Sequence, residues 1–254
     1  MGSINIDIVD AFDDNYLFVI NEESGITACV DPGDPDAIID YLEANNLTLD
    51  MILCTHHHPD HIGGVKKLKN KYDCPVVASE ADQHRIEADE YVIEGDALEV
   101  GEASCEVLFV PGHTTGHVAY HFPDNGVVFV GDSMFRLGCG RLFEGTPEQM
   151  WSSLKKLKNL DPDTMVYCAH EYSEANAKFC LDLEPDNELV KNEAALISKM
   201  RKDGERTVPF KLGREAQISP FLRADDPELK EKLGCSDKED SRAFAIIRER
   251  KDNF

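Results

Sequence analysis

The feature that most constrains this chain of 254 residues is a repeated pairing of a short apolar run with a His or Asp side chain just after it. Four such pairings carry the argument: His56 to His61 after Met51–Cys54, His113 after Cys105–Val110, Asp132 after Val127–Val130, and His170 after Met165–Cys168. Short apolar runs that end in turn residues are typical of buried strands. We therefore predict a sheet whose strand ends gather these side chains at one edge.

The pattern of the chain changes near residue 170. Up to that point strand-like runs alternate with helical patterns such as 35–46 and 147–160, which predicts an α/β catalytic domain over residues 1–170. Asp34, ahead of Pro35, is the expected N-cap of the first of these helices. Beyond Glu171 the strand-like runs stop, and helical patterns cover 172–183, 188–202, 227–233 and 238–250. We predict a small all-helical second domain over residues 171–254.

The segment His56-His57-His58-Pro59-Asp60-His61 is the densest group of potential metal ligands in the sequence. Imidazole and carboxylate groups suit zinc, iron or manganese. In an extended loop His56 and His58 point the same way, while Asp60 and His61 reach a neighbouring position. One loop cannot fill two coordination spheres, so we expect His113, Asp132 and His170 to complete them. The remaining histidines are expected to be non-ligands: His57, His84, His117 and His121.

This arrangement resembles the metallo-β-lactamase superfamily, in which a Thr-His-x-His-x-Asp-His segment precedes a further His, Asp and His in the same order. The resemblance implies an αββα sandwich with two metal ions at one edge. It also implies the ligand sets: His56, His58 and His113 for the first metal, Asp60, His61 and His170 for the second, and Asp132 as the bridge between them.

A second stretch narrows the resemblance to the glyoxalase II (hydroxyacylglutathione hydrolase) enzymes. The run Gly138-Cys139-Gly140-Arg141-Leu142-Phe143-Glu144-Gly145-Thr146 is similar to the segment these enzymes carry after the bridging Asp, and residues 169–179 and 248–254 match them as well. The resemblance covers essentially the whole chain. It implies a set of glutathione-binding residues: Arg141, Phe143, Tyr172, Asn176, Phe179, Arg248 and Lys251. Some relatives have Lys and Tyr in place of Arg141 and Phe143, so this chain lacks one phenol that those relatives offer to the substrate.

The implied activity is hydrolysis of S-D-lactoylglutathione and other S-2-hydroxyacylglutathiones to glutathione and D-lactate or the matching acid, the second step of methylglyoxal detoxification. Two divalent metal ions, expected to be zinc with iron or manganese as alternatives, would hold the attacking hydroxide between them. Asp60 and Asp132 are the expected catalytic carboxylates, because they offset the metal charge and orient the nucleophile. The leaving thiolate needs no dedicated acid, since its conjugate acid has a pKa of about 8.5. Cys139 lacks an obvious base and is expected to be structural.

Charge limits the partners of the chain. Lys and Arg total 26 against 49 Asp and Glu, which gives a formal net charge of −23, and such a surface repels nucleic acid and anionic membrane. We expect a monomer whose partner is a small glutathione thioester, and an acidic surface that serves solubility or a salty cytoplasm. Glutathione carries two carboxylates, so its binding requires a local reversal of sign that Arg141, Arg248 and Lys251 would supply.

Cysteine usage and apolar runs predict the location. No apolar run approaches the ~20 residues of a membrane helix, and Met1–Asp7 lacks the basic and apolar regions of a signal peptide. The eight cysteines form no C-x-x-C pair, so we expect reduced thiols in the core. These observations predict a cytoplasmic protein.

Three other functions share parts of the pattern. A persulfide dioxygenase uses the same His and Asp ligands with a single iron, and is recognised by oxygen uptake with glutathione persulfide. A β-lactamase is usually exported, and a nucleic-acid-processing or binding protein fits poorly with the acidic surface. The sequence leaves open the identity of the metals, the range of acyl groups and the oligomeric state.

Overall fold

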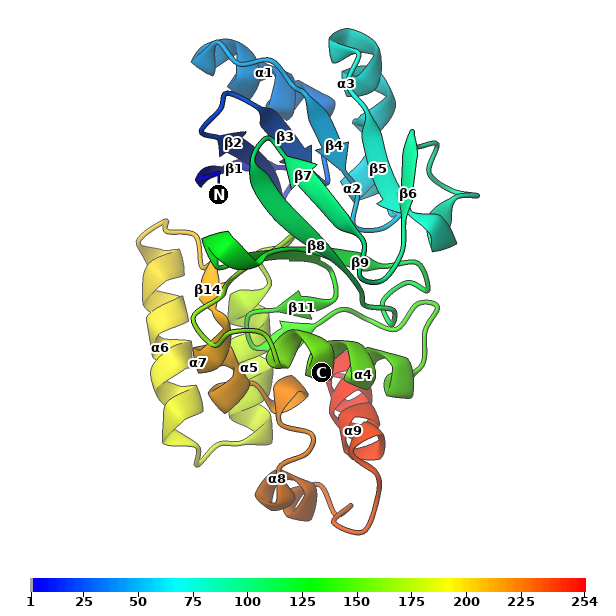
Figure 1. The fold of residues 1–254 in the computed structure, drawn as a ribbon. Coiled ribbons are helices and arrows are strands. Elements are labelled where there is room, and N and C mark those ends of the chain that lie inside the picture. The colour runs from blue at the N-terminus through cyan, green and yellow to red at the C-terminus, as the bar shows by residue number, and fades with distance from the viewer. Residues whose placement is uncertain (1) are drawn as a thin grey trace. The chain divides into compact units, whose positions relative to one another are not determined.

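A computed structural model describes residues 2–254, which form two compact units (Figure 1). The first unit is made of the described residues up to Phe109 together with Gly116–Gly131. The second is made of Val110–Thr115 and Asp132–Phe254. The short segment that carries His113 therefore belongs to the second unit, although both of its flanks belong to the first.

The described part of the first unit is built on two sheets. In the first sheet the strands lie side by side in the order β1-β2-β3-β4-β5-β6. Neighbouring strands are antiparallel from β1 through β3 and parallel from β3 through β6. In the second sheet β7, β8, β9 and β10 lie side by side in this order, and each pair of neighbours is antiparallel. The strands are β1 (Ile4–Ala11), β2 (Asn15–Glu22), β3 (Thr27–Val30), β4 (Met51–Leu53), β5 (Val76–Ser79), β6 (Glu90–Val92), β7 (Ala97–Val100), β8 (Ala103–Phe109), β9 (Val118–Phe122) and β10 (Val127–Gly131).

Side chains of β2 alternate between two apolar layers, as the period of a strand requires. Leu17 and Val19 join a buried cluster that includes residues of α1 (Pro35–Asn45) and α3 (Val65–Tyr72). Phe18 points to the other side, where its ring centroid lies 5.4 Å from that of Phe129 on β10. The two sheets of this unit therefore face each other, and the two helices cover the outer face of the first sheet (Figure 1).

The second unit is mainly helical. Its helices are α4 (Pro147–Lys158), α5 (Ser173–Leu183), α6 (Glu188–Lys202), α7 (Leu212–Ile218), α8 (Pro227–Lys232) and α9 (Asp240–Asp252), and its short strands are β11 (Met134–Phe135), β12 (Gly138–Cys139), β13 (Met165–Cys168) and β14 (Phe210–Lys211). Aromatic side chains join the helices: the ring of Phe221 lies 5.8 Å from Phe179 on α5 and 6.3 Å from Phe244 on α9, and Phe244 stacks on Trp151 of α4.

Most of the elements predicted from the sequence are confirmed within two residues. Met165–Cys168 and Glu188–Lys202 are observed with the predicted bounds. Asp34 caps α1 as predicted, because its side chain accepts hydrogen bonds from the N–H groups of Asp36 and Ala37. The prediction that strands stop after Glu171 is wrong, since β14 pairs with β13; two residues are too few to show alternation.

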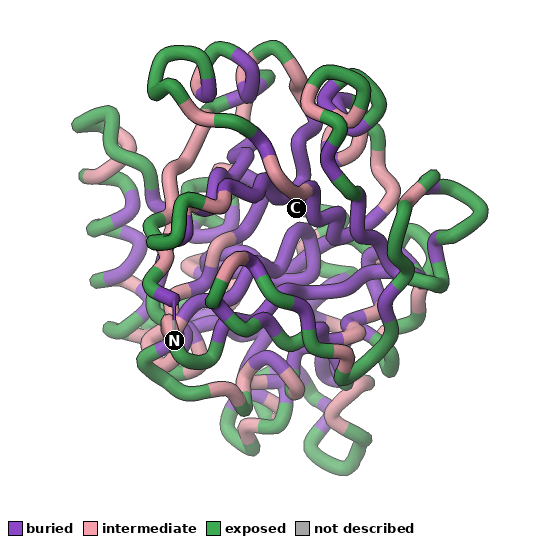
Figure 2. Tube along the Cα trace, turned by 45° about the horizontal axis from the view of Figure 1, so that its top comes forward, coloured by how far each residue is buried: buried purple, intermediate pink, exposed green. Residues whose placement is uncertain are grey.

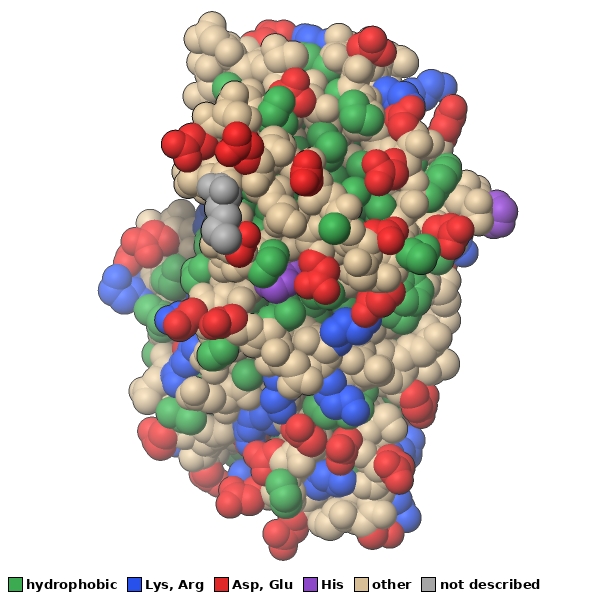
Figure 3. All heavy atoms as spheres, in the orientation of Figure 1, with side chains coloured by type: hydrophobic (Ala, Val, Ile, Leu, Met, Phe, Trp, Pro, Cys, Tyr) green, Lys and Arg blue, Asp and Glu red, His purple; other side chains and the backbone are tan. Residues whose placement is uncertain are grey.

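Buried residues lie mainly on the strands and on the inner sides of the helices, and exposed residues lie in the loops and on the outer sides of the helices (Figure 2). On the face drawn in Figure 3, Asp and Glu side chains are scattered among Lys and Arg instead of forming one patch. Among residues 2–254, no helix has the length and apolar character needed to cross a membrane.

Candidate functional site

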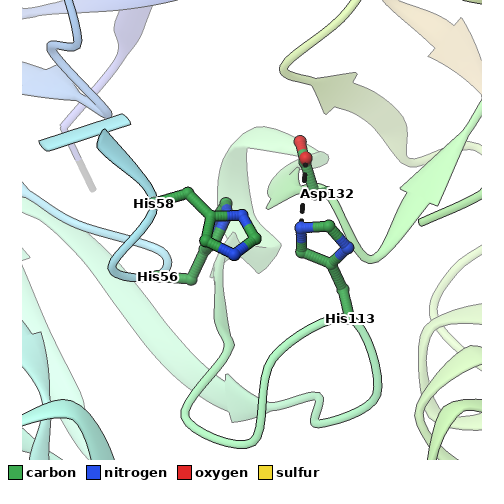
Figure 4. Close-up of side chains that lie close together, drawn as sticks. All are labelled: His56, His58, His113 and Asp132. Carbon is green, nitrogen blue, oxygen red and sulfur yellow. Dashed lines mark ion pairs between the residues drawn. The ribbon is translucent and has the colours of Figure 1, made fainter. Parts of the chain in front are cut away.

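In the first unit, the predicted ligands lie where β4 ends. His56 and His58 come from the segment that follows this strand (Figure 4), and His58 is the N-cap of a single helical turn, α2 (Pro59–Ile62). Asp60 and His61 therefore lie on a helical turn, and not in the extended loop that the sequence led us to expect. His56 and His61 are buried, while His58 and Asp60 are partly exposed.

A buried carboxylate, Asp31, orients two of these histidines. Its Oδ2 atom accepts hydrogen bonds from His61 Nδ1 at 3.0 Å and from the Thr55 hydroxyl at 2.6 Å. Because the Thr55 hydroxyl donates to Asp31, its oxygen accepts from His56 Nδ1 at 3.1 Å. Both imidazoles are thereby held with the proton on Nδ1 and with Nε2 available as a metal ligand, the arrangement that carboxylate partners impose in metal sites.

The backbone packs tightly around this segment. A Cβ atom added to Gly33 would lie 1.7 Å from the carbonyl oxygen of Asp60, and one added to Gly64 would lie 2.3 Å from the carbonyl oxygen of Pro32. Glycine at these two positions lets the turn after Asp31 and the helical turn α2 approach each other backbone to backbone. The position of Asp60 and His61 therefore depends on residues that carry no functional group.

The other histidines have different surroundings. His57 Nδ1 lies 3.2 Å from the buried carboxylate of Asp82, and His117 stacks on the ring of His56 with a centroid distance of 4.6 Å. His121 Nδ1 lies 3.7 Å from Glu106, and burial lowers the pKa of His121 in spite of that carboxylate. His84 is exposed.

In the second unit, Asp132 lies between two histidines. Its Oδ2 atom is 3.4 Å from His113 Nε2 (Figure 4), and its Oδ1 atom is 3.3 Å from His170 Nε2. Each carboxylate oxygen thus faces a different imidazole, which is the arrangement a carboxylate needs in order to bridge two cations. Nitrogen and oxygen donors of this kind suit zinc, iron or manganese. On the chemistry of their donors, these three side chains fit a divalent metal.

His113 is oriented by the segment that follows β12. Its Nδ1 atom donates to the carbonyl oxygen of Arg141 at 2.8 Å, so Nε2 is the atom turned toward Asp132. A Cβ atom on Gly140 would lie 2.2 Å from the carbonyl oxygen of Asp132 and 2.8 Å from His113 Nδ1. This close approach explains why Gly stands between Cys139 and Arg141. The loop of His113 is held further by Glu144, which accepts hydrogen bonds from the N–H and the hydroxyl of Thr115.

A pocket of about 490 Å³ opens beside His113 and Asp132, within the second unit. Aromatic and charged side chains line most of it. The lining residues are His113, Asp132, Phe135, Cys139, Gly140, Arg141, Phe143, Tyr172, Ala175, Asn176, Arg248, Lys251, Asp252 and Phe254. Six of the seven residues predicted to bind glutathione are among them, and Phe179 is not.

The three basic side chains of the pocket differ in their freedom to move. Arg248 is only 5% exposed, and its guanidinium donates to the carbonyl oxygen of Cys139 at 2.8 Å and to Asp252 at 2.9 Å. Lys251 is partly buried and donates to the carbonyl oxygen of Ala175, and its pKa is lowered by burial and then by the charges of Arg248 and Arg141. The Arg141 side chain is 65% exposed, with Nε 3.7 Å from Asp252. Arg141 and Lys251 are therefore better placed than Arg248 to reach a ligand.

Of the four other residues predicted to bind glutathione, two contact histidines of the site and two support other parts of the pocket. Tyr172 stacks on His170 with a centroid distance of 4.7 Å, and Phe143 lies edge-on to His113 at 5.3 Å. Asn176 is buried and donates to the carbonyl oxygen of Arg136, so it also supports the turn between β11 and β12. Phe179 is buried beneath Lys251, whose Nζ lies 5.4 Å from the centre of its ring.

Cys139 lines the pocket as a buried thiol. Burial raises the pKa of Cys139 to about 11, although the nearby Arg248 guanidinium acts in the opposite direction. The thiol therefore stays protonated near neutral pH and is a poor nucleophile.

Sequence reasoning missed the residues that support the ligands, namely Asp31, Thr55 and Asn15. Asp31 directly follows a strand-like run, so the same pattern that pointed to Asp132 also pointed to it. Asn15 donates from Nδ2 to Asp60 Oδ2 at 3.1 Å, across 45 positions of sequence. No local pattern signals that contact.

Comparison with protein families gives two adjacent matches. The family described as the metallo-β-lactamase superfamily matches residues 13–170. The family described as the hydroxyacylglutathione hydrolase C-terminus matches residues 171–254.

Two curated relatives are named hydroxyacylglutathione hydrolase. The one from Maricaulis maris is 45% identical over 95% of this chain and 95% of its own length, and the one from Ruegeria pomeroyi is 45% identical over 99% of each. Among solved structures, the B3 metallo-β-lactamase BLEG-1 is similar with a TM-score of 0.68 at 23% identity, over 86% of this chain and 99% of that one. The di-iron-bound form of TTHA1623 has a TM-score of 0.63 at 25% identity, over 84% of this chain and 98% of that one. These similarities confirm the predicted α/β sandwich fold.

Proposed function

Because the chain belongs to the metallo-β-lactamase superfamily, and within it to the hydroxyacylglutathione hydrolases, we propose that it hydrolyses S-D-lactoylglutathione and other S-2-hydroxyacylglutathiones to glutathione and the hydroxy acid. The observation that carries this proposal is the pocket of the second unit. In a protein of net charge −23, it combines three basic side chains with the His113 and Asp132 donors. Such a pocket suits an anionic ligand whose reactive group reaches a metal.

We assign different roles to the two parts of the chain that the two families match. Residues 1–170 form the catalytic domain, and residues 171–254 supply most of the binding side chains for glutathione. Arg141 and Lys251 bind carboxylates of glutathione, and guanidinium suits bidentate contact with such a group. Tyr172, Phe143 and Asn176 contact the peptide portion. Arg248 shapes the pocket through its contacts with Cys139 and Asp252, and Phe179 supports Lys251 from below.

The proposed metal ligands are those of the superfamily resemblance. His56, His58 and His113 hold the first cation, Asp60, His61 and His170 hold the second, and Asp132 is shared. Bound divalent cations supply a water ionised near neutral pH and polarise the carbonyl that it attacks. Zinc is the first choice and iron or manganese are alternatives, because all three accept imidazole and carboxylate donors. The di-iron form of a structurally similar protein supports iron as one of the candidates.

The side chains of the chain itself perform the other steps. Asp60 and Asp132 reduce the positive charge of the site and orient the attacking water. Asp31, Thr55 and the Arg141 carbonyl keep the protons of His61, His56 and His113 on Nδ1, which preserves Nε2 as the ligand atom. The glutathione thiolate is a good leaving group, with a conjugate acid of pKa about 8.5. No acid is therefore needed at the sulfur, and Cys139 stays a thiol.

Location and assembly complete the proposal. We place the enzyme in the cytoplasm as a monomer. The eight cysteines support a reducing compartment, because each is a free, buried thiol in the part of the chain that the structure describes.

The test is a comparison of substrates with purified protein. We expect release of free thiol from S-D-lactoylglutathione, and at least tenfold lower kcat/KM for a D-lactoyl thioester of an uncharged thiol, since the latter offers no carboxylate to Arg141 and Lys251. Equal kcat/KM values would contradict the proposed pocket. Oxygen uptake with glutathione persulfide in the absence of thioester hydrolysis would instead establish the single-iron oxidoreductase.

A further inference from the structure

Asn15 is a buried polar residue that touches a proposed metal ligand. It is the first residue of β2, its exposed fraction is 6%, and its Nδ2 atom donates to Asp60 Oδ2 at 3.1 Å. The same carboxylate oxygen lies 3.5 Å from His61 Nε2, the nitrogen left available as a ligand atom by the bond from His61 Nδ1 to Asp31. Asn15 therefore contacts Asp60 from β2, at the carboxylate oxygen that faces His61.

The two partners of this hydrogen bond differ in how firmly they are held. Asn15 pairs with Ala11 across the β1–β2 hairpin, and Tyr16, the next residue, is buried. Asp60, by contrast, lies on a single helical turn, and its side chain is 41% exposed. Asn15 is thus the fixed partner of the hydrogen bond, and Asp60 is the partner whose side-chain rotamer the hydrogen bond selects.

The chemistry of the amide suits this task. A Lys or Arg at position 15 would neutralise Asp60 and compete with a cation for it. A neutral N–H donor fixes the direction of the carboxylate and leaves its full negative charge for the metal. Partners that orient a ligand in this way commonly account for a 10- to 100-fold change in metal affinity.

We propose that Asn15 is a positioning residue for Asp60, and that it sets the affinity of the second cation without contacting that cation. This inference rests on the proposed function, because Asp60 is a ligand only in that proposal. A purely structural role for Asn15 predicts loss of stability without a selective loss of one metal.

The experiment measures zinc binding by competition with a chromophoric chelator, using full-length protein stripped of metal and without substrate. Asn15→Ala should weaken the second equivalent of zinc by about 10- to 100-fold and leave the first within twofold. The matched control is Asn21→Ala, since Asn21 lies on the same strand and donates from Nδ2 to Asp7. It should leave both equivalents unchanged. Should Asn15→Ala not fold, Asn15→Thr keeps a shorter donor at the same position and should give a smaller loss of the same kind.

A double-mutant cycle separates positioning from general destabilisation. In an Asp60→Ala background, Asn15→Ala should cause no further loss of zinc affinity, because the group through which it acts is absent. An equal loss in both backgrounds would overturn the proposal, as would an Asn15→Ala protein that binds both equivalents like the wild type. A wild-type chain that takes up no second equivalent would overturn the proposed function itself, and this inference with it.

Discussion

Asp31 is the side chain on which the orientation of two proposed ligands depends. It adopts a left-handed backbone conformation, with φ of +52°, and its side chain is almost completely buried. Asp and Asn tolerate this conformation better than most residues. Position 31 therefore needs a residue that tolerates a positive φ and whose side chain accepts hydrogen bonds. Two donors, His61 Nδ1 and the Thr55 hydroxyl, converge on its Oδ2 atom.

Replacing Asp31 with Asn tests that role with little change of shape. The asparagine can keep φ of +52°, but both carboxylate oxygens of Asp31 accept hydrogen bonds, Oδ2 from His61 and the Thr55 hydroxyl and Oδ1 from the Thr55 N–H at 2.7 Å. An amide has only one oxygen, so its NH2 group would face a donor on one side. We expect metal affinity to fall by about 10- to 100-fold, measured by chelator competition, while circular dichroism shows an unchanged fold. Asp31→Asn protein with wild-type metal affinity would mean that His56 and His61 are oriented by other contacts.

Of the three basic residues of the pocket, Lys251 should act in binding and Arg248 in support. Lys251→Ala should raise KM for S-D-lactoylglutathione by about tenfold, the equivalent of ~1.4 kcal/mol, with little effect on kcat. Arg248→Ala should lower the free energy of unfolding by about 2 kcal/mol, because it removes charged hydrogen bonds to Cys139 and Asp252. Urea unfolding and steady-state kinetics on both variants check this. A destabilised Lys251→Ala beside an intact Arg248→Ala would reverse the assignment.

At this scale the sequence identified the histidines and aspartates but not the residues that orient them. The ligand candidates follow strand-like runs, so a local pattern indicates them. Thr55 and Asn15 act through contacts that form only when distant segments pack, and neither residue type is unusual where it stands. The Arg141 carbonyl that orients His113 is a backbone atom, for which side-chain identity gives no signal.

Among the elements, the β11–β12 hairpin brings Cys139 and the following Arg141 to the pocket. Its turn includes Leu137, which has φ of +57° and whose N–H donates to Glu215 of α7 at 2.5 Å. Glu215 is fully buried, and this burial raises its pKa to about 8 despite the hydrogen bond from Leu137 and the charge of Arg136. The hairpin is therefore anchored by a carboxyl group that is protonated in the folded protein at neutral pH.

The raised pKa of Glu215 predicts a pH dependence of stability. Unfolded, a glutamate has a pKa of about 4.3, so between that value and about 8 the folded protein binds more protons than the unfolded one. The free energy of unfolding should then fall as pH rises through this window. Glu215→Gln stays neutral, so relative to wild type it should gain stability between pH 5 and pH 8 in urea unfolding. The exposed Glu231→Gln is the control, and parallel curves for Glu215→Gln and wild type would contradict the assignment.

Elements with a long periodic pattern or a continuous apolar run were predictable, and polar or two-residue elements were not. The helix Glu188–Lys202 has buried residues at regular helical spacing, whereas α3 (Val65–Tyr72) buries only Val65 and Leu68 and is otherwise mostly lysine and asparagine. β6 is an edge strand with a largely exposed sequence, and β14 has two residues. β6 and β14 are strands because each pairs with a neighbouring strand, and their own sequences do not indicate that pairing.

For the whole molecule, the main electrostatic contrast is between the surface and one pocket. A net charge of −23 raises the cost of approach for an anion such as glutathione. Arg141 and Lys251 offset this locally, and a bound pair of divalent cations would add positive charge next to them. The acidic surface and the anionic substrate are therefore compatible only if the metal donors and the basic pocket act together.

The most direct test of that claim measures metal content and thioesterase activity in the same samples. Protein stripped of metal is reloaded with increasing zinc, iron or manganese, and each sample is divided between elemental analysis and the S-D-lactoylglutathione assay. We expect activity to be absent without metal and to reach its maximum near two equivalents per chain. In Asp132→Ala, which lacks the shared carboxylate, we expect both bound metal and rate to fall. Full activity in the stripped protein, or normal metal content and rate in Asp132→Ala, would contradict the account.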